Sequence, residues 1–129
     1  MIEWLNGLEA MIEKPLGLGL GESGRVANAS GDNIGGENQL VIIGVQAGVI
    51  AMFTYLTIYI AILVLGLKQL KLAKGQFYTL ALITVLLKLG LFIPMFTANI
   101  DAYIYVSFLS WFLSGLMVNL YQSKTEDIV

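Results

Sequence analysis

The feature that most constrains this chain is an unbroken uncharged run from Leu40 to Leu67. About 20 apolar residues suffice to cross the hydrocarbon core of a bilayer, so this run is long enough to span with tilt. Two more apolar segments follow: Phe77–Thr97, interrupted only by Lys88, and Ala102–Tyr121, which carries no charge. Because backbone groups in lipid must bond within their own segment, we predict an all-α membrane protein with three transmembrane helices, at about 40–67, 77–97 and 102–121.

The residues before the first span differ in character. Residues 1–13 place apolar side chains at helical spacing with Glu and Asn between them, which predicts a short amphipathic helix ending at Lys14-Pro15. We favour a position on the bilayer surface or against other helices over contact with a substrate. Residues 15–38 are rich in glycine and predict a loop outside the hydrocarbon. The chain therefore divides into an arm, 1–38, and a three-span region with a short tail, 39–129.

Basic residues predict the orientation of the spans. Lys68, Lys71 and Lys74 share one short loop, and Lys124 lies in the tail on the same side, whereas the other short loop contains Asp101. The positive-inside rule places the lysine loop and the C-terminus in the cytoplasm. The arm is then expected outside, at the periplasmic or extracellular face.

Composition excludes several functions. The chain contains neither His nor Cys, which removes the commonest metal ligands and the commonest general base, and we predict no metal and no cofactor. A formal net charge of −2 gives no reason to expect a nucleic-acid partner.

The glycine-rich part of the arm is the first candidate for a ligand site. Gly19, Gly21 and Gly24 could let the backbone approach an anion and turn its amides outward, and Arg25 follows directly. Guanidinium suits phosphate or carboxylate. A plain flexible turn is the more ordinary interpretation of this spacing, which matches no known nucleotide-binding motif.

Three further polar residues allow two interpretations each. Asn38 is a good N-cap for the first span, and Glu37 is favoured near a helix N-terminus, so capping alone can explain both. Glu37 could instead serve as a general base or bind a sugar hydroxyl. A lysine within a span costs about 2.5–3.5 kcal/mol on insertion scales, so Lys88 should face protein, water or an anion. Its partner could be a lipid-linked phosphate or simply a polar group of a helix bundle.

The order of these features resembles the C-terminal region of bacterial O-antigen polymerase and O-antigen ligase-like membrane proteins. The resemblance rests on three stretches and covers nearly all of this chain, but only about the final third of a typical family member. The first stretch is W-L-N-G-L-E-A-M-I-E-K-P-L-G-L-G-L-G-E-S-G, from Trp4. The second is E-N-Q-L-V-I-I-G-V-Q-A-G-V-I-A, which includes Gly48-Val49-Ile50. The third is N-I-D-A-Y-I-Y-V-S-F-L-S-W-F-L-S-G-L, with Ser107, Trp111 and Gly115.

The resemblance implies transfer of a glycan from an undecaprenyl-pyrophosphate carrier to an acceptor outside the cytoplasmic membrane. Carried over, Arg25 would bind the pyrophosphate or the anionic glycan, and Glu37 and Asn38 would line the acceptor site. The candidate catalytic residues are thus Arg25 and Glu37. The candidate substrate-binding residues are Gly19, Gly21, Gly24, Asn38 and Lys88.

One departure narrows the expected activity. Ligases of this family place a His just before the Asn, where this chain has Glu37, so the resemblance favours a repeat-unit polymerase. Three helices cannot enclose a lipid-linked donor and an acceptor, so we expect activity only beside the remaining helices of a larger protein or complex. The alternative is a small non-enzymatic membrane protein, such as an accessory or scaffold subunit or a virion membrane protein.

Overall fold

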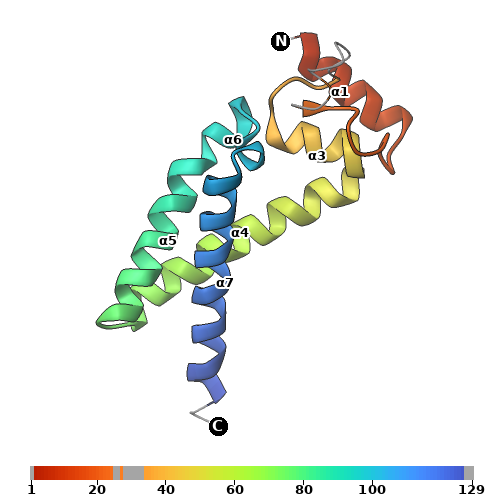
Figure 1. Cartoon of the computed structure of the whole chain (residues 1–129). Helices are drawn as coiled ribbons and strands as arrows, with labels where there is room; N and C mark the ends of the chain where they lie inside the picture. The colour runs from red at the N-terminus through yellow and green to blue at the C-terminus, as the bar shows by residue number, and fades with distance from the viewer. Residues whose placement is uncertain (1, 25–26, 28–33, 127–129) are drawn as a thin grey trace.

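The computed structural model describes residues 2–24, 27 and 34–126, and within them the chain forms only helices and turns (Figure 1). The elements are α1 (Ile2–Glu13), α3 (Gln39–Ala47), α4 (Val49–Leu72), α5 (Gln76–Phe92), α6 (Pro94–Thr97), the 3₁₀ turn η1 (Ile100–Ala102) and α7 (Ile104–Glu126). The predicted all-α class is confirmed.

Three long helices form the body of the protein and a smaller layer lies at one end of it. Helices α4, α5 and α7 pack on one another, with α4 crossing the other two obliquely (Figure 1). Helices α1 and α3 form the end layer, and η1 lies between α6 and α7 on the same side. The last turns of α4, which contain Lys68 and Lys71, and the short loop to α5, which contains Lys74, lie at the opposite end, so only one of the three lysines predicted to share this loop is in it (Figure 1).

The predicted number of helices long and apolar enough to cross a membrane is confirmed, but the first of them begins later than predicted. The helices long and apolar enough to cross a membrane are Val49–Leu72, Gln76–Thr97 and Ile104–Tyr121. The predicted 40–67 helix is wrong at its start, because the apolar run is divided at Gly48 into α3 and α4. Helix α3 packs against α1 instead of extending the span.

Gly48 breaks the helix because its backbone adopts φ 92° and ψ 166°, a conformation open almost only to glycine. The break is stabilised by the arm, since the amide of Val49 donates to the carbonyl of Pro15 at 3.0 Å. A Cβ at position 48 would lie 2.6 Å from that same carbonyl oxygen. The packing of the arm against α4 therefore depends on the break at Gly48, and the arm in turn provides the acceptor for the Val49 amide.

The second and third spans agree closely with the predicted ranges. Pro94 begins the short helix α6, where its fixed φ and missing N–H suit the first helical position. The turn after α6 is closed by Asn99, whose side chain accepts from the amide of Ala102 at 3.2 Å.

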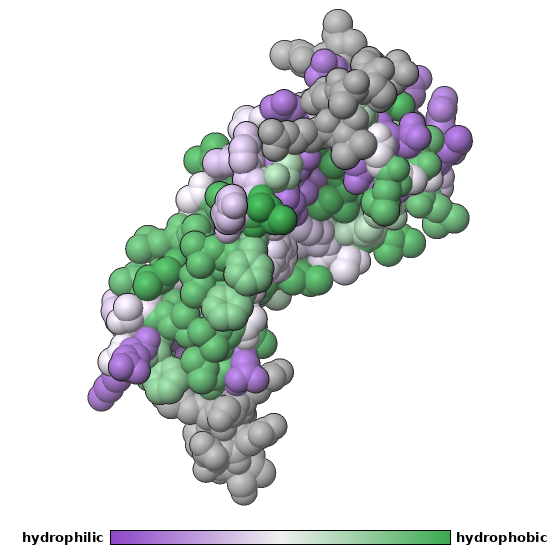
Figure 2. All heavy atoms as spheres, viewed as in Figure 1, coloured by the Kyte–Doolittle hydropathy of each residue, from purple (hydrophilic) through white to green (hydrophobic). Residues whose placement is uncertain are grey.

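Apolar packing forms three separate clusters along the molecule. The arm cluster contains Met11, Val41 and Val45 and joins α1 to α3. The middle cluster contains Tyr59, Met95 and Ile100, and the third contains Ile62, Ala81 and Met117 from the three long helices. Most other apolar side chains of the spans face outward, which suits a hydrocarbon environment (Figure 2).

Candidate functional site

An open polar hollow of about 400 Å³ lies where the arm, α3 and η1 converge. It combines segments that are far apart in sequence and sits above the three spans, at the end of the molecule that carries the arm (Figure 1). Its lining residues are Ser23, Gln39, Ile42, Ile43, Gln46, Asn99, Asp101 and Ala102. Five of the eight have polar side chains, so the hollow can offer hydrogen bonds to a hydroxyl-rich or charged ligand.

Among the described residues that line this hollow, Asp101 alone is ionisable. Its carboxylate accepts from Gln39 Nε2 at 3.0 Å and from Ser107 Oγ at 3.1 Å, and its own amide donates to Gln39 Oε1 at 3.1 Å. The Tyr55 hydroxyl also interacts with this carboxylate. The reciprocal pair with Gln39 fixes η1 against the start of α3, and Ser107 fixes it to α7.

Ser23, which lines the hollow, fixes the described start of the glycine-rich loop. Its side chain is 1% exposed, and its hydroxyl donates to the carbonyl of Ile34, near the far end of the loop. Its own carbonyl accepts from Gln46 Nε2 on α3 at 2.7 Å. Arg25 lies between these anchors in sequence but outside the described residues, so its predicted role stays a prediction.

The first glycines of the loop do not turn their amides outward as expected. The amide of Gly17 donates to the carbonyl of Lys14, that of Leu18 to Val45, and that of Gly19 to Gln46. Hydrogen bonds to the protein thus occupy the amide of Gly19, which was predicted to bind substrate. These bonds attach the loop to the end of α3 instead of forming an anion nest.

The later glycines lie nearer the hollow. Gly24 is buried, and a Cβ added there would lie 3.0 Å from Asn99 Nδ2 and 3.3 Å from Ile42. Gly21 is half-buried with φ 99°. The structure therefore brings Gly24 to the hollow, while substrate binding by Gly21 and Gly24 stays a prediction.

The expected capping role of Asn38 is confirmed. Its side-chain oxygen accepts from the amides of Leu40 at 3.0 Å and Val41 at 3.2 Å, and the residue is buried. The neighbouring Glu37 is exposed and does not line the hollow. The roles of Glu37 and Asn38 at an acceptor site stay predictions.

Lys88 faces the interior of the bundle, as predicted from the free-energy cost of exposing a lysine to lipid. Its side chain is 1% exposed, and Nζ lies 3.8 Å from the centre of the Trp111 ring and 4.7 Å from that of Tyr59. The Tyr59 hydroxyl donates to the backbone carbonyl of Lys88. Ring faces attract cations, and Asp101 adds a favourable electrostatic interaction. Lys88 of α5 thus contacts aromatic rings of both α4 and α7.

We expect Lys88→Met to keep the fold and Lys88→Ala to weaken it. Methionine fills the space beside the Tyr59 and Trp111 rings without the cost of a buried charge. Alanine leaves a cavity there, which lowers the stability of the fold by about 2–5 kcal/mol. Thermal unfolding in detergent should give a melting temperature for Lys88→Met near that of the wild type and clearly above that of Lys88→Ala. Equal losses in both variants would show instead that the charge itself holds the bundle. Contact of Lys88 with a phosphate stays a separate prediction.

Sequence reasoning missed most of the residues that line the hollow. Gln39, Gln46 and Asn99 were not singled out, and Asp101 entered only as a marker of orientation. One signal was present: each is an uncommon polar residue within or beside an apolar run, where an unsatisfied amide or carboxylate is costly. Their convergence, however, is a property of the folded chain.

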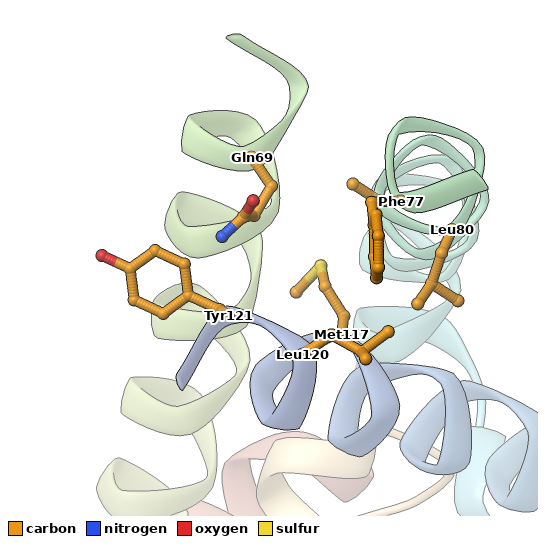
Figure 3. A pocket seen from close by; sticks show the side chains of 7 residues that line it. Gln69, Phe77, Leu80, Met117, Leu120 and Tyr121 are labelled. Carbon is orange, nitrogen blue, oxygen red and sulfur yellow. The ribbon is translucent and has the colours of Figure 1, made fainter. Parts of the chain in front are cut away.

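A second hollow lies at the opposite end of the bundle, among α4, α5 and α7 (Figure 3). Gln69 points toward it from α4, opposite Phe77 and Leu80 of α5 and Met117 of α7. Its volume is about 10 Å³, which is close to the least that a single water needs. It is too small for a substrate, so the polar hollow is the better candidate site.

The fold and the candidate site define a class: a helical membrane protein of three candidate spans with a polar hollow at one end. Comparisons with protein-family models, with curated proteins and with solved structures found no match to this chain.

Proposed function

We propose that this chain forms the closing part of a bacterial repeat-unit polymerase, which transfers glycan from an undecaprenyl-pyrophosphate carrier at the outer face of the cytoplasmic membrane. The observation that carries the proposal is the polar hollow at the junction of the arm and the spans, which Ser23 of the glycine-rich loop helps to line. Amide and carboxylate side chains suit the hydroxyls of a sugar, and the adjacent bilayer would hold the lipid carrier. The sequence resemblance supports the same activity.

In this proposal, the two sides of the hollow have different roles. Arg25 follows Ser23 and Gly24, which border the hollow, so its guanidinium would neutralise the pyrophosphate. Asp101, held by Gln39 and Ser107, would position the acceptor by accepting a sugar hydroxyl. Glu37, which is exposed and precedes the lining residue Gln39 by two positions, would act as the base, with Asn38 keeping the start of α3 in place.

The exposed outer sides of the spans would contact the remaining helices of the enzyme as well as lipid. Fewer than a third of the residues in each span are buried within this chain. Lys68, Lys71 and Lys74 lie at the end opposite the arm, and they would place that end in the cytoplasm.

We expect Arg25→Ala, introduced into the gene that encodes this chain, to abolish long glycan chains while single repeat units remain. Loss of the guanidinium removes the charge that would stabilise the departing pyrophosphate. Gel profiles of surface glycan from a deletion strain complemented with wild type or variant measure the effect. Lys14→Ala, which removes another cation of the arm at an exposed position, should leave the ladder unchanged.

Two outcomes of this experiment would contradict the proposal. A normal ladder with Arg25→Ala, at wild-type protein levels, would remove Arg25 from the reaction. A normal ladder in the deletion strain itself would exclude the polymerase function, and it would favour the alternative of a non-enzymatic accessory subunit.

A further inference from the structure

Helix α1 has three distinct sides. With about 3.6 residues per turn, Gly7 and Met11 fall on one side, where both are buried against α3 and the loop. The second side carries apolar residues that are exposed by 40% to 82% of their surface: Trp4, Leu5, Leu8 and Ile12. The third side carries Asn6, Glu13 and other polar residues, all exposed.

The turn after α1 extends the second side. Leu18 packs inward on the arm cluster, whereas Leu16 is 81% exposed and Leu20 is 89% exposed. Such exposure is unusual for leucine beside a well-packed core. We use the name apolar edge for these exposed apolar residues of α1 and the following turn: Trp4, Leu5, Leu8, Ile12, Leu16 and Leu20.

The apolar edge is continuous with the membrane-spanning surface. The carbonyl of Pro15 accepts from Val49, the first residue of α4, and the backbone of Leu16 lies against Gly48. Leu16 is therefore level with the outer end of that span. The next outward-facing residues of α4, Ile50 and Phe53, are also exposed. Figure 2 shows hydrophobic residues along this side of the arm, with hydrophilic residues beyond them.

We propose that the apolar edge is inserted among the lipids of the adjacent leaflet, with Leu16 and Leu20 as its deepest residues, while the Asn6 side of α1 remains in water. The helix would thus divide its surface among protein, lipid and water. Lipid is the occupant that continuity with α4 favours, since both surfaces would meet the same hydrocarbon boundary. This proposal does not depend on the proposed polymerase function.

The charge of the arm specifies the kind of lipid contact. Helix α1 carries Glu3, Glu9 and Glu13 and no cation, and Lys14 follows it. An acidic helix gains nothing from anionic headgroups, so insertion must depend on apolar contact and not on electrostatic attraction. We therefore expect the same insertion in zwitterionic vesicles and in vesicles that also contain anionic lipid.

The absence of cysteine from the sequence makes a direct test possible. Single-cysteine variants Leu16→Cys and Leu20→Cys, with Asn6→Cys and Glu13→Cys as controls from the polar side, carry a spin label on the full chain in phosphatidylcholine vesicles. Collision with oxygen, which concentrates in lipid, is compared with collision with a water-soluble nickel chelate. We expect oxygen to dominate at positions 16 and 20 and the chelate to dominate at positions 6 and 13.

Three results would overturn the proposal. Chelate access at positions 16 and 20 equal to that at the controls would place the apolar edge in water. Low access to both reagents would mean that a second copy or another protein covers it. Insertion seen only after phosphatidylglycerol is added would show that attraction to the anionic headgroups, and not apolar contact, binds the arm to the membrane. All four positions are exposed, so these labels should leave the fold intact.

Discussion

Gly48→Ala is expected to detach the arm from the membrane-spanning bundle and to cost about 3 kcal/mol or more. Alanine must adopt φ 92°, ψ 166°, which alone costs about 1–3 kcal/mol. Its Cβ would also lie 2.6 Å from the Pro15 carbonyl oxygen and 2.8 Å from the carbonyl carbon of Leu16. These are backbone atoms, which cannot move aside as a flexible side chain can. Relief requires the arm to shift, which breaks the hydrogen bond from Val49 to Pro15.

Two measurements check this expectation. The melting temperature in detergent should fall, and a glutamate-specific protease should cut after Glu13 and Glu22 faster than in the wild type. Gly90→Ala is the matched control, because Gly90 lies within α5 and a Cβ there meets nothing within 4 Å. That variant should be neutral or slightly stabilising. Unchanged stability and cleavage in Gly48→Ala would mean that α3 and α4 can form one continuous helix without cost.

Asp101→Ala is expected to destabilise the end of the bundle by about 3 kcal/mol. The substitution leaves the buried Gln39 amide and the Ser107 hydroxyl without their acceptor. Each unsatisfied buried donor costs about 1–3 kcal/mol.

A double-mutant cycle separates this network from simple loss of volume. Asp101→Asn keeps the shape and one acceptor, so its loss of stability should be intermediate. Asp101→Ala and Gln39→Ala should cost less together than the sum of the two single changes, because each removes the hydrogen bond from Gln39 Nε2 to the Asp101 carboxylate. Strictly additive losses would contradict a shared network. Thermal unfolding of the wild type, the two single alanine variants and the double variant gives the four values of the cycle. The same measurement on Asp101→Asn tests its intermediate loss.

Part of the candidate site was predictable and part was not. The cap at Asn38 follows from local chemistry, because an asparagine before an apolar run serves the first free amides of a helix wherever that helix packs. The inward position of Lys88 follows from the cost of charge in lipid. The rings that receive Lys88 could not be predicted, because Tyr59 and Trp111 come from other helices and look like ordinary apolar positions.

The sequence by itself determined the three spans and the helical class, because membrane crossing depends on the length and hydropathy of each segment alone. Only the tertiary structure decided where the first span begins. The uncharged run continues through Gly48, and the helix breaks there because the carbonyl of Pro15 is available to the freed amide of Val49. The polar hollow has the same origin, since Gln39 and Asp101 are 62 residues apart. Hydrogen bonds between distant segments require the packed chain, and no local pattern records them.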